Sequence, residues 1–112
     1  MSQLTTHILD TTRGLPAKLV TVILYEHVGH EWIEVANGIT NKDGRIPNLL
    51  PEGDILPFGT YKLKFETRSY FKTLGVQSFY PMVEIIFEIL TKEHYHVPLL
   101  LNPFGYTTYR GS

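Results

Sequence analysis

The sequence predicts an all-β fold, an antiparallel β-sandwich of two sheets with one short helix. Three observations favour this fold. Several segments alternate apolar and polar residues with a period of two, β-branched and aromatic residues fill them, and turn-forming residues separate them at short intervals. The chain has 112 residues, about the size of one domain. We therefore expect a single domain that spans residues 1–112, built from roughly seven or eight short strands.

Strands are expected where β-branched, aromatic or alternating residues form runs, and turns where Gly, Pro, Asn and Asp interrupt these runs. The clearest strand is 61–66, which alternates strictly between apolar and charged residues. The expected strands are 4–9, 19–25, 32–36, 61–66, 83–89, a segment beginning near 94, and 105–110. The expected connections are 12–16, 26–30, 41–44, a long irregular section at 47–57, and 102–105.

Residues 67–74 alone suit a short helix, with Thr67 as its N-cap and Gly75 as its C-terminal stop. The last strand, 105–110, is expected at a sheet edge, where it can pair with another subunit. Pro98 cannot donate a hydrogen bond to a sheet, so the strand that contains it is expected at an edge or with a bulge.

Charge and composition exclude several classes of protein. Ten Lys and Arg against eleven Asp and Glu give a net charge of −1, and no basic run suggests a nucleic-acid partner. No apolar stretch approaches the ~20 residues of a transmembrane helix, and the first residues lack the features of a signal peptide. We therefore expect a cytoplasmic protein with no membrane partner. The absence of cysteine excludes disulfides, thiolate metal sites and a cysteine nucleophile.

Histidine offers the most chemistry in this sequence. It stands at five positions: His7, His27, His30, His94 and His96. In a regular strand His94 and His96 project from the same face and lie side by side. A single histidine in a strand is nevertheless more often a surface or hydrogen-bonded residue than a catalyst, because imidazole has many other uses.

Three interpretations of the histidines remain open on the residues alone. The first is a zinc site made by His7, His94 and His96 with a bound hydroxide. The second has no metal: one imidazole takes a proton from water, and Arg45, which follows an Asp-Gly turn, stabilises the oxyanion. The third is a binding module for an apolar ligand, in which the histidines have no catalytic part. Gly-rich phosphate loops and Gly-x-Ser-x-Gly elbows are missing.

Three motifs are more specific than these patterns. Residues 6–17, THILDTTRGLPA, resemble the opening of the transthyretin family. Residues 94–103, HYHVPLLLNP, and the ending 109–112, YRGS, resemble the enzymatic branch of that family, the 5-hydroxyisourate hydrolases. The motifs occur in the right order, and the resemblance spans essentially the whole chain.

The resemblance implies a transthyretin-like sandwich assembled as a homotetramer, in which edge strands pair to make dimers and two dimers enclose a channel with the active sites. The implied reaction is hydrolysis of 5-hydroxyisourate to 2-oxo-4-hydroxy-4-carboxy-5-ureidoimidazoline in urate degradation, with no cofactor and no metal. The alternative within the family is a hormone-type carrier without catalysis, but carriers lack the YRGS ending.

The family's site positions map onto five residues of this chain. The resemblance implies that His7, Arg45, His96 and Ser112 are catalytic, and that His7 and Arg45 bind substrate together with Tyr109. His94 shares a motif with His96, but we leave it outside the catalytic set as a structural residue.

Overall fold

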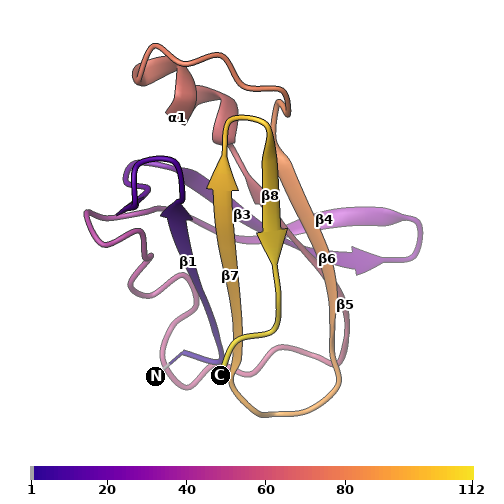
Figure 1. Ribbon diagram of the computed structural model, residues 1–112. Helices are drawn as coiled ribbons and strands as arrows, with labels where there is room; N and C mark the ends of the chain where they lie inside the picture. Colours follow the sequence, from indigo (N-terminus) through magenta and orange to yellow (C-terminus); the bar gives the residue numbers. More distant parts are fainter. Residues whose placement is uncertain (1) are drawn as a thin grey trace.

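The computed structural model describes residues 2–112 and has two four-stranded sheets packed as a sandwich with one short helix (Figure 1). The first sheet has the strand order β2-β1-β7-β8, and the second has the order β4-β3-β5-β6. The elements are β1 (Leu4–Asp10), β2 (Leu15–Pro16), β3 (Thr21–Val28), β4 (Glu31–Ile39), β5 (Gly59–Phe65), α1 (Thr67–Thr73), β6 (Val83–Ile89), β7 (Tyr95–Asn102) and β8 (Gly105–Thr108). The predicted two-sheet sandwich with one short helix is therefore confirmed.

The period-two alternation fixes which side chains fill the sandwich. Every second residue of β1, beginning with Leu4, is buried, and the residues between them are half-buried on the outer face. Strand β5 alternates in the same way from Tyr61 to Phe65. The inward residues of both sheets form one apolar core, which includes Ile8, Leu63 and Leu99. Burial of this apolar surface is the main force that holds the sheets together.

One strand pair departs from the antiparallel prediction. β1 and β7 run parallel, and all other pairs are antiparallel. β7 lies between β1 and β8, so the prediction of an edge strand or a bulge at Pro98 is wrong. The carbonyl of Pro98 accepts a hydrogen bond from Thr108 Oγ1 at 2.8 Å, which shows that this carbonyl points toward β8. The ladder to β8 begins one residue later, at Leu99, so no sheet hydrogen bond is lost.

The helix lies where it was expected, but its first turn differs. Glu66 is the N-cap, without a side-chain hydrogen bond. Thr67 is not the predicted cap, because its side chain is buried instead. Gly75 ends the helix as predicted: it takes a φ of +70°, and its N–H donates to the Lys72 carbonyl at 3.0 Å. No helix in residues 2–112 is long and apolar enough to span a membrane.

The hairpin of β3 and β4 is longer than predicted. Its strands extend to Val28 and from Glu31, which shortens the expected connection at 26–30 to two residues. His27 and Trp32 pair across the strands with their rings stacked at 4.6 Å, and such cross-strand aromatic contacts stabilise a ladder. β3 begins later than predicted, at Thr21, because Leu19 has a φ of +62°.

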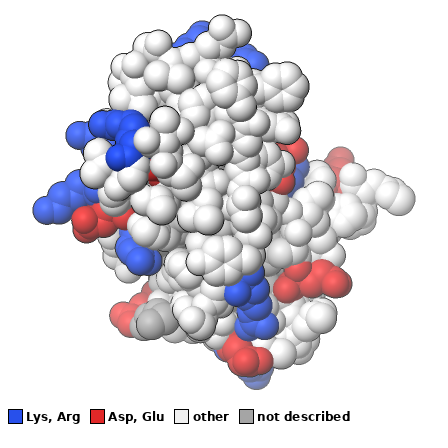
Figure 2. All heavy atoms as spheres, viewed as in Figure 1, with Lys and Arg blue, Asp and Glu red and all other residues white. Residues whose placement is uncertain are grey.

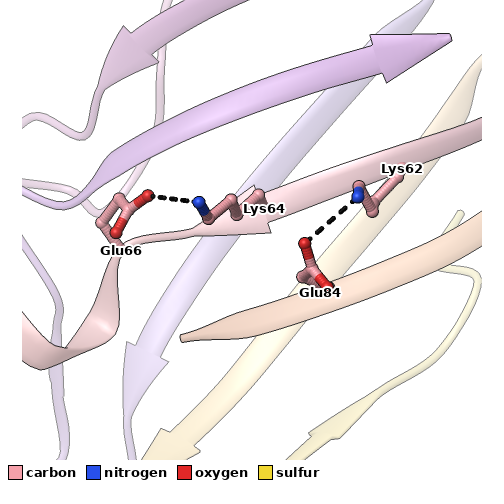
Figure 3. A network of polar contacts seen from close by, with 4 residues as sticks. All are labelled: Lys62, Lys64, Glu66 and Glu84. Atoms are coloured by element: carbon pink, nitrogen blue, oxygen red, sulfur yellow. Dashed lines mark ion pairs between the residues drawn. The ribbon is translucent and has the colours of Figure 1, made fainter. Parts of the chain in front are cut away.

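The outer faces of the two sheets differ in charge. On the second sheet Lys62 pairs with Glu84 and Lys64 with Glu66, each at 3.2 Å (Figure 3). The face in front in Figure 1 belongs to β1, β7 and β8, and it is largely uncharged over its centre and upper part (Figure 2). The predicted site residues of β1 and β7 belong to this less charged face.

A buried carboxylate ties β1 to the helix and gives a test of the packing. Asp10 is 1% exposed, and its Oδ2 accepts a hydrogen bond from the Tyr70 hydroxyl at 2.6 Å. Burial raises the pKa of Tyr70 to about 12, so this hydroxyl stays protonated as a donor.

We expect Tyr70→Phe to lower the free energy of unfolding by about 1–3 kcal/mol, because Oδ2 of Asp10 then loses its donor inside the protein. Urea unfolding monitored by circular dichroism measures the change. The matched control is Tyr106→Phe, whose hydroxyl has no hydrogen-bond partner in residues 2–112. Equal stability of the two variants would contradict the prediction.

Candidate functional site

The site begins with the parallel register of β1 and β7. Thr5 lies opposite His96, and His7 lies opposite Pro98. Paired residues of neighbouring strands project from the same face of a sheet, and Thr5, His7 and His96 are all half-buried on the outer face. The register therefore brings two imidazoles from opposite ends of the chain to one surface.

Arg45 reaches this surface from the Asp-Gly turn that follows β4. The N–H of Asn41 donates to the Arg45 carbonyl at 2.8 Å, and the N–H of Ile8 donates to the Gly44 carbonyl at 2.9 Å. Gly44 is required here, because it takes a φ of +73° and a Cβ would collide with the Ile8 carbonyl oxygen. The turn is thus fastened to β1, and Arg45 forms an isolated bridge with His7.

The C-terminal segment lies against the other imidazole. The N–H of Gly111 donates to the His96 carbonyl at 2.8 Å, and a Cβ on Gly111 would come within 2.7 Å of His96 Cδ2. The Arg110 guanidinium lies 4.3 Å from the centre of the Tyr95 ring, a cation–π contact that anchors the segment. Figure 1 shows the end of the chain beside the starts of β1 and β7. Ser112 therefore follows directly on a residue held against His96.

Burial and a nearby positive charge lower the pKa of both imidazoles and so favour their neutral form. Burial and then the nearby Arg45 charge lower the pKa of His7 below its usual value. The pKa of His96 is lowered first by burial, then by Arg45, and further by His94 and His7. The same charge acts on both rings, so the three side chains lie within electrostatic reach of one another.

Thr5 contacts two histidines: His96, which lies on β7, and His94, which directly precedes that strand. Its Oγ1 lies 2.8 Å from His94 Nε2 and 2.7 Å from His96 Nδ1. Both nitrogens are thus engaged with a hydroxyl. Among residues 2–112, no three His, Asp or Glu side chains are grouped closely enough to hold a metal ion. The geometry does not favour the zinc site of His7, His94 and His96.

Two hollows adjoin these residues. A cavity of about 260 Å³ lies beside Arg45. Its lining consists of Ser2, Thr5, Thr6, Asn41, Arg45, Ile46, Pro47 and Asn48. A larger apolar hollow of about 460 Å³ opens between the edge strands β6 and β8. Its lining includes Ile85, Phe87, Leu90, Tyr95, Val97, Thr108, Tyr109 and Arg110.

The structure brings together some of the predicted site residues and not others. His7, Arg45 and His96 lie together on one face. Ser112 follows Gly111, which is hydrogen-bonded to His96, and its own part in the site stays a prediction. Tyr109 lines the apolar hollow instead, so its contact with substrate stays a prediction. Sequence reasoning missed Thr5. The alternation that exposes His7 also exposes Thr5, but the register that sets it against His96 is not visible in the sequence.

The fold and this arrangement define a transthyretin-type β-sandwich with a polar site on the outer face of its first sheet. Residues 4–111 match the model of the HIUase/Transthyretin family, and the chain belongs to this family. The resemblance seen in the sequence motifs is thereby confirmed.

Relatives and solved structures agree with this assignment. The chain is 53% identical to a mouse protein named 5-hydroxyisourate hydrolase, over 99% of this chain and 96% of that protein. A structure of Klebsiella pneumoniae 5-hydroxyisourate hydrolase superposes with a TM-score of 0.86 at 40% identity, covering 99% of this chain and 100% of the other. Sea bream transthyretin in complex with thyroxine superposes with a TM-score of 0.91 at 33% identity, covering 97% and 94%.

The influence of Arg45 on the two imidazoles can be measured without an activity assay. We expect Arg45→Gln to raise the pKa of both His7 and His96, because a positive charge that disfavours the imidazolium is removed. Titration of the ring signals by NMR measures both values. In the control Arg68→Gln, a change at an exposed helix position, both pKa values should stay unchanged. Unaltered values in Arg45→Gln would refute the proximity argued above.

Proposed function

We propose that this protein is a hydrolase that opens the six-membered ring of 5-hydroxyisourate and yields 2-oxo-4-hydroxy-4-carboxy-5-ureidoimidazoline in urate degradation. The observation that carries the proposal is the convergence of Arg45, His7 and His96 on one sheet face, with the pKa of both imidazoles lowered. A fixed cation beside neutral imidazoles suits the addition of water to a carbonyl. The similarity to proteins named 5-hydroxyisourate hydrolase supports the same substrate.

The reaction needs a base, a partner for the oxyanion and a proton for the leaving nitrogen. One imidazole takes a proton from water while the water oxygen forms a bond to the carbonyl carbon. The carbonyl oxygen becomes an oxyanion, and the Arg45 guanidinium, which is always protonated, donates hydrogen bonds to it. When the intermediate collapses, the C–N bond breaks and the leaving nitrogen takes up the proton. The imidazole is then neutral again.

The remaining predicted roles belong to the same proposal. Ser112, through its hydroxyl or the terminal carboxylate, holds a histidine or the attacking water, and Tyr109 orders the substrate. The mechanism uses no metal and no cofactor. A cytoplasmic location and the lack of nucleic-acid and membrane partners stay predictions.

Substitution of the three converging residues tests the function. We expect His7→Ala, His96→Ala and Arg45→Ala each to lower kcat by ~10²–10⁴-fold, the usual contribution of one general base or one oxyanion donor. The assay follows freshly generated 5-hydroxyisourate spectrally, with the uncatalysed decay subtracted.

His30→Ala is the matched control, because His30 is exposed in the turn between β3 and β4 and should leave kcat unchanged. Activity like that of the wild type in all three variants would refute the site. A wild-type protein with no activity that binds thyroxine would instead favour the carrier alternative.

We further propose that the protein forms a homotetramer. Strands β6 and β8 are sheet edges on the same side of the sandwich, and the apolar hollow opens between them. Ile86 on β6 is 61% exposed and Phe79 just before β6 is 70% exposed. Unprotected edges and exposed apolar side chains favour pairing with a second copy. The centre and upper part of the first sheet's outer face are largely uncharged, which suits the contact between two such dimers (Figure 2).

A charge on one edge should disrupt this assembly. We expect Ile86→Lys to give a smaller species than the wild type in sedimentation velocity, because a lysine at an edge opposes strand pairing. Ile39→Lys is the control: Ile39 is 58% exposed and lies on β4, the other edge of the same sheet. The proposal fails if the wild type is monomeric, or if both variants sediment as it does.

A further inference from the structure

The hydroxyl of Thr5 is shared by two imidazoles. Its Oγ1 lies 2.8 Å from Nε2 of His94 and 2.7 Å from Nδ1 of His96. The two rings are close to parallel, with an angle of 24° between their planes and 6.3 Å between their centres. All three side chains are half-buried, so these contacts are partly shielded from water.

Counting protons limits what this triplet can do. A hydroxyl carries one proton, and a neutral imidazole carries one N–H. Thr5 can therefore donate to only one of the two rings, and when it does so its contact with the other ring requires that ring to donate. The protonation of His94 and that of His96 are thus coupled through one oxygen.

The contact at His96 and the chemistry of a base together set the direction of this coupling. Nδ1 of His96 contacts the Thr5 hydroxyl, so Nε2 is the ring nitrogen that remains for the substrate. A base needs an unprotonated nitrogen, so for His96 to take a proton from water its own proton must lie on Nδ1. Nδ1–H then donates to the Thr5 hydroxyl, and Nε2 keeps a free lone pair.

We propose that Thr5 is a positioning residue: its hydroxyl accepts from His96 Nδ1–H and donates to His94 Nε2, so that His96 presents an unprotonated Nε2 as the base. The direction of the two hydrogen bonds rests on the proposed function, in which an imidazole acts as the base. It gives His94 a role, since the ring accepts the hydroxyl proton and thereby orients Thr5. Partners of this kind, which fix the tautomer of a working imidazole, typically contribute about 10- to 100-fold to function in metal sites.

NMR of the protein labelled with ¹⁵N at histidine reports each tautomer directly. We expect His96 to carry its proton on Nδ1, and His94 to carry its proton on Nδ1 with Nε2 free. The variants His94→Gln and His96→Gln assign the signals. In Thr5→Val we expect a mixture of tautomers at His96. A wild-type His96 protonated on Nε2, a wild-type His94 protonated on Nε2, or no change in Thr5→Val would each overturn the proposal.

Kinetics give the second readout. We expect Thr5→Val to lower kcat by about 10- to 100-fold with little change in KM, and Thr5→Ser to restore kcat because it keeps the hydroxyl. Thr107→Val, at an exposed position of β8, should behave like the wild type. The melting temperature of each variant separates loss of folding from loss of activity.

The outcomes separate this inference from the proposed function. A rise in KM alone would make Thr5 a substrate contact and overturn its positioning role. If His96→Ala is fully active while the tautomers are as expected, the function assigned to His96 fails but the coupling stands. If His96→Ala is inactive while Thr5→Val keeps both its kcat and its tautomers, the coupling fails and the function stands.

Discussion

The parallel pairing of β1 with β7 is the constraint on which the site depends. It joins the first strand of the chain to the next-to-last, and its register alone sets Thr5 against His96 and places His7 two residues further along the same face. A shift by one residue would turn every side chain of one strand to the opposite face. That would bury the histidines and expose the apolar residues between them. The burial of Ile8 and Leu99 in the core therefore fixes the site as firmly as it fixes the fold.

Two segments without regular structure complete the site, and each is held by backbone contacts with these strands. The Asp-Gly turn bonds to Ile8 through the Gly44 carbonyl, and the C-terminal segment bonds to His96 through Gly111. Both glycines stand where a Cβ would meet the site strands. Close approach of backbone is thus what allows a loop arginine and the end of the chain to reach one surface.

Much of the fold could be predicted because alternation is local. The strands predicted at 61–66 and 83–89 correspond to β5, which spans Gly59–Phe65, and to β6. The predicted stop at Gly75 is also found, because glycine readily takes the φ of +70° that ends the helix. The parallel pair could not be predicted, because pairing between the two ends of the chain leaves no local trace. Pro98 predicted an edge strand because proline has no N–H to donate. In the structure this missing N–H is harmless, because the ladder to β8 starts only at Leu99. The resemblance to the family identified His7, Arg45 and His96 as site residues. The position of Thr5 beside His96 could be found only from the register of β1 and β7.

The proposed assembly would affect the chemistry through the exclusion of water. In one subunit Arg45 is exposed and both imidazoles are half-buried, so an oxyanion beside the guanidinium would still be largely solvated. Two unit charges 4 Å apart attract by about 1 kcal/mol in bulk water and by about 4 kcal/mol at an effective dielectric constant of 20. A second subunit facing this sheet would exclude water and so strengthen the attraction between the guanidinium and the oxyanion. The same exclusion would lower the imidazole pKa values further and keep a base available. The proposed tetramer would therefore serve the reaction as well as the stability of the edges.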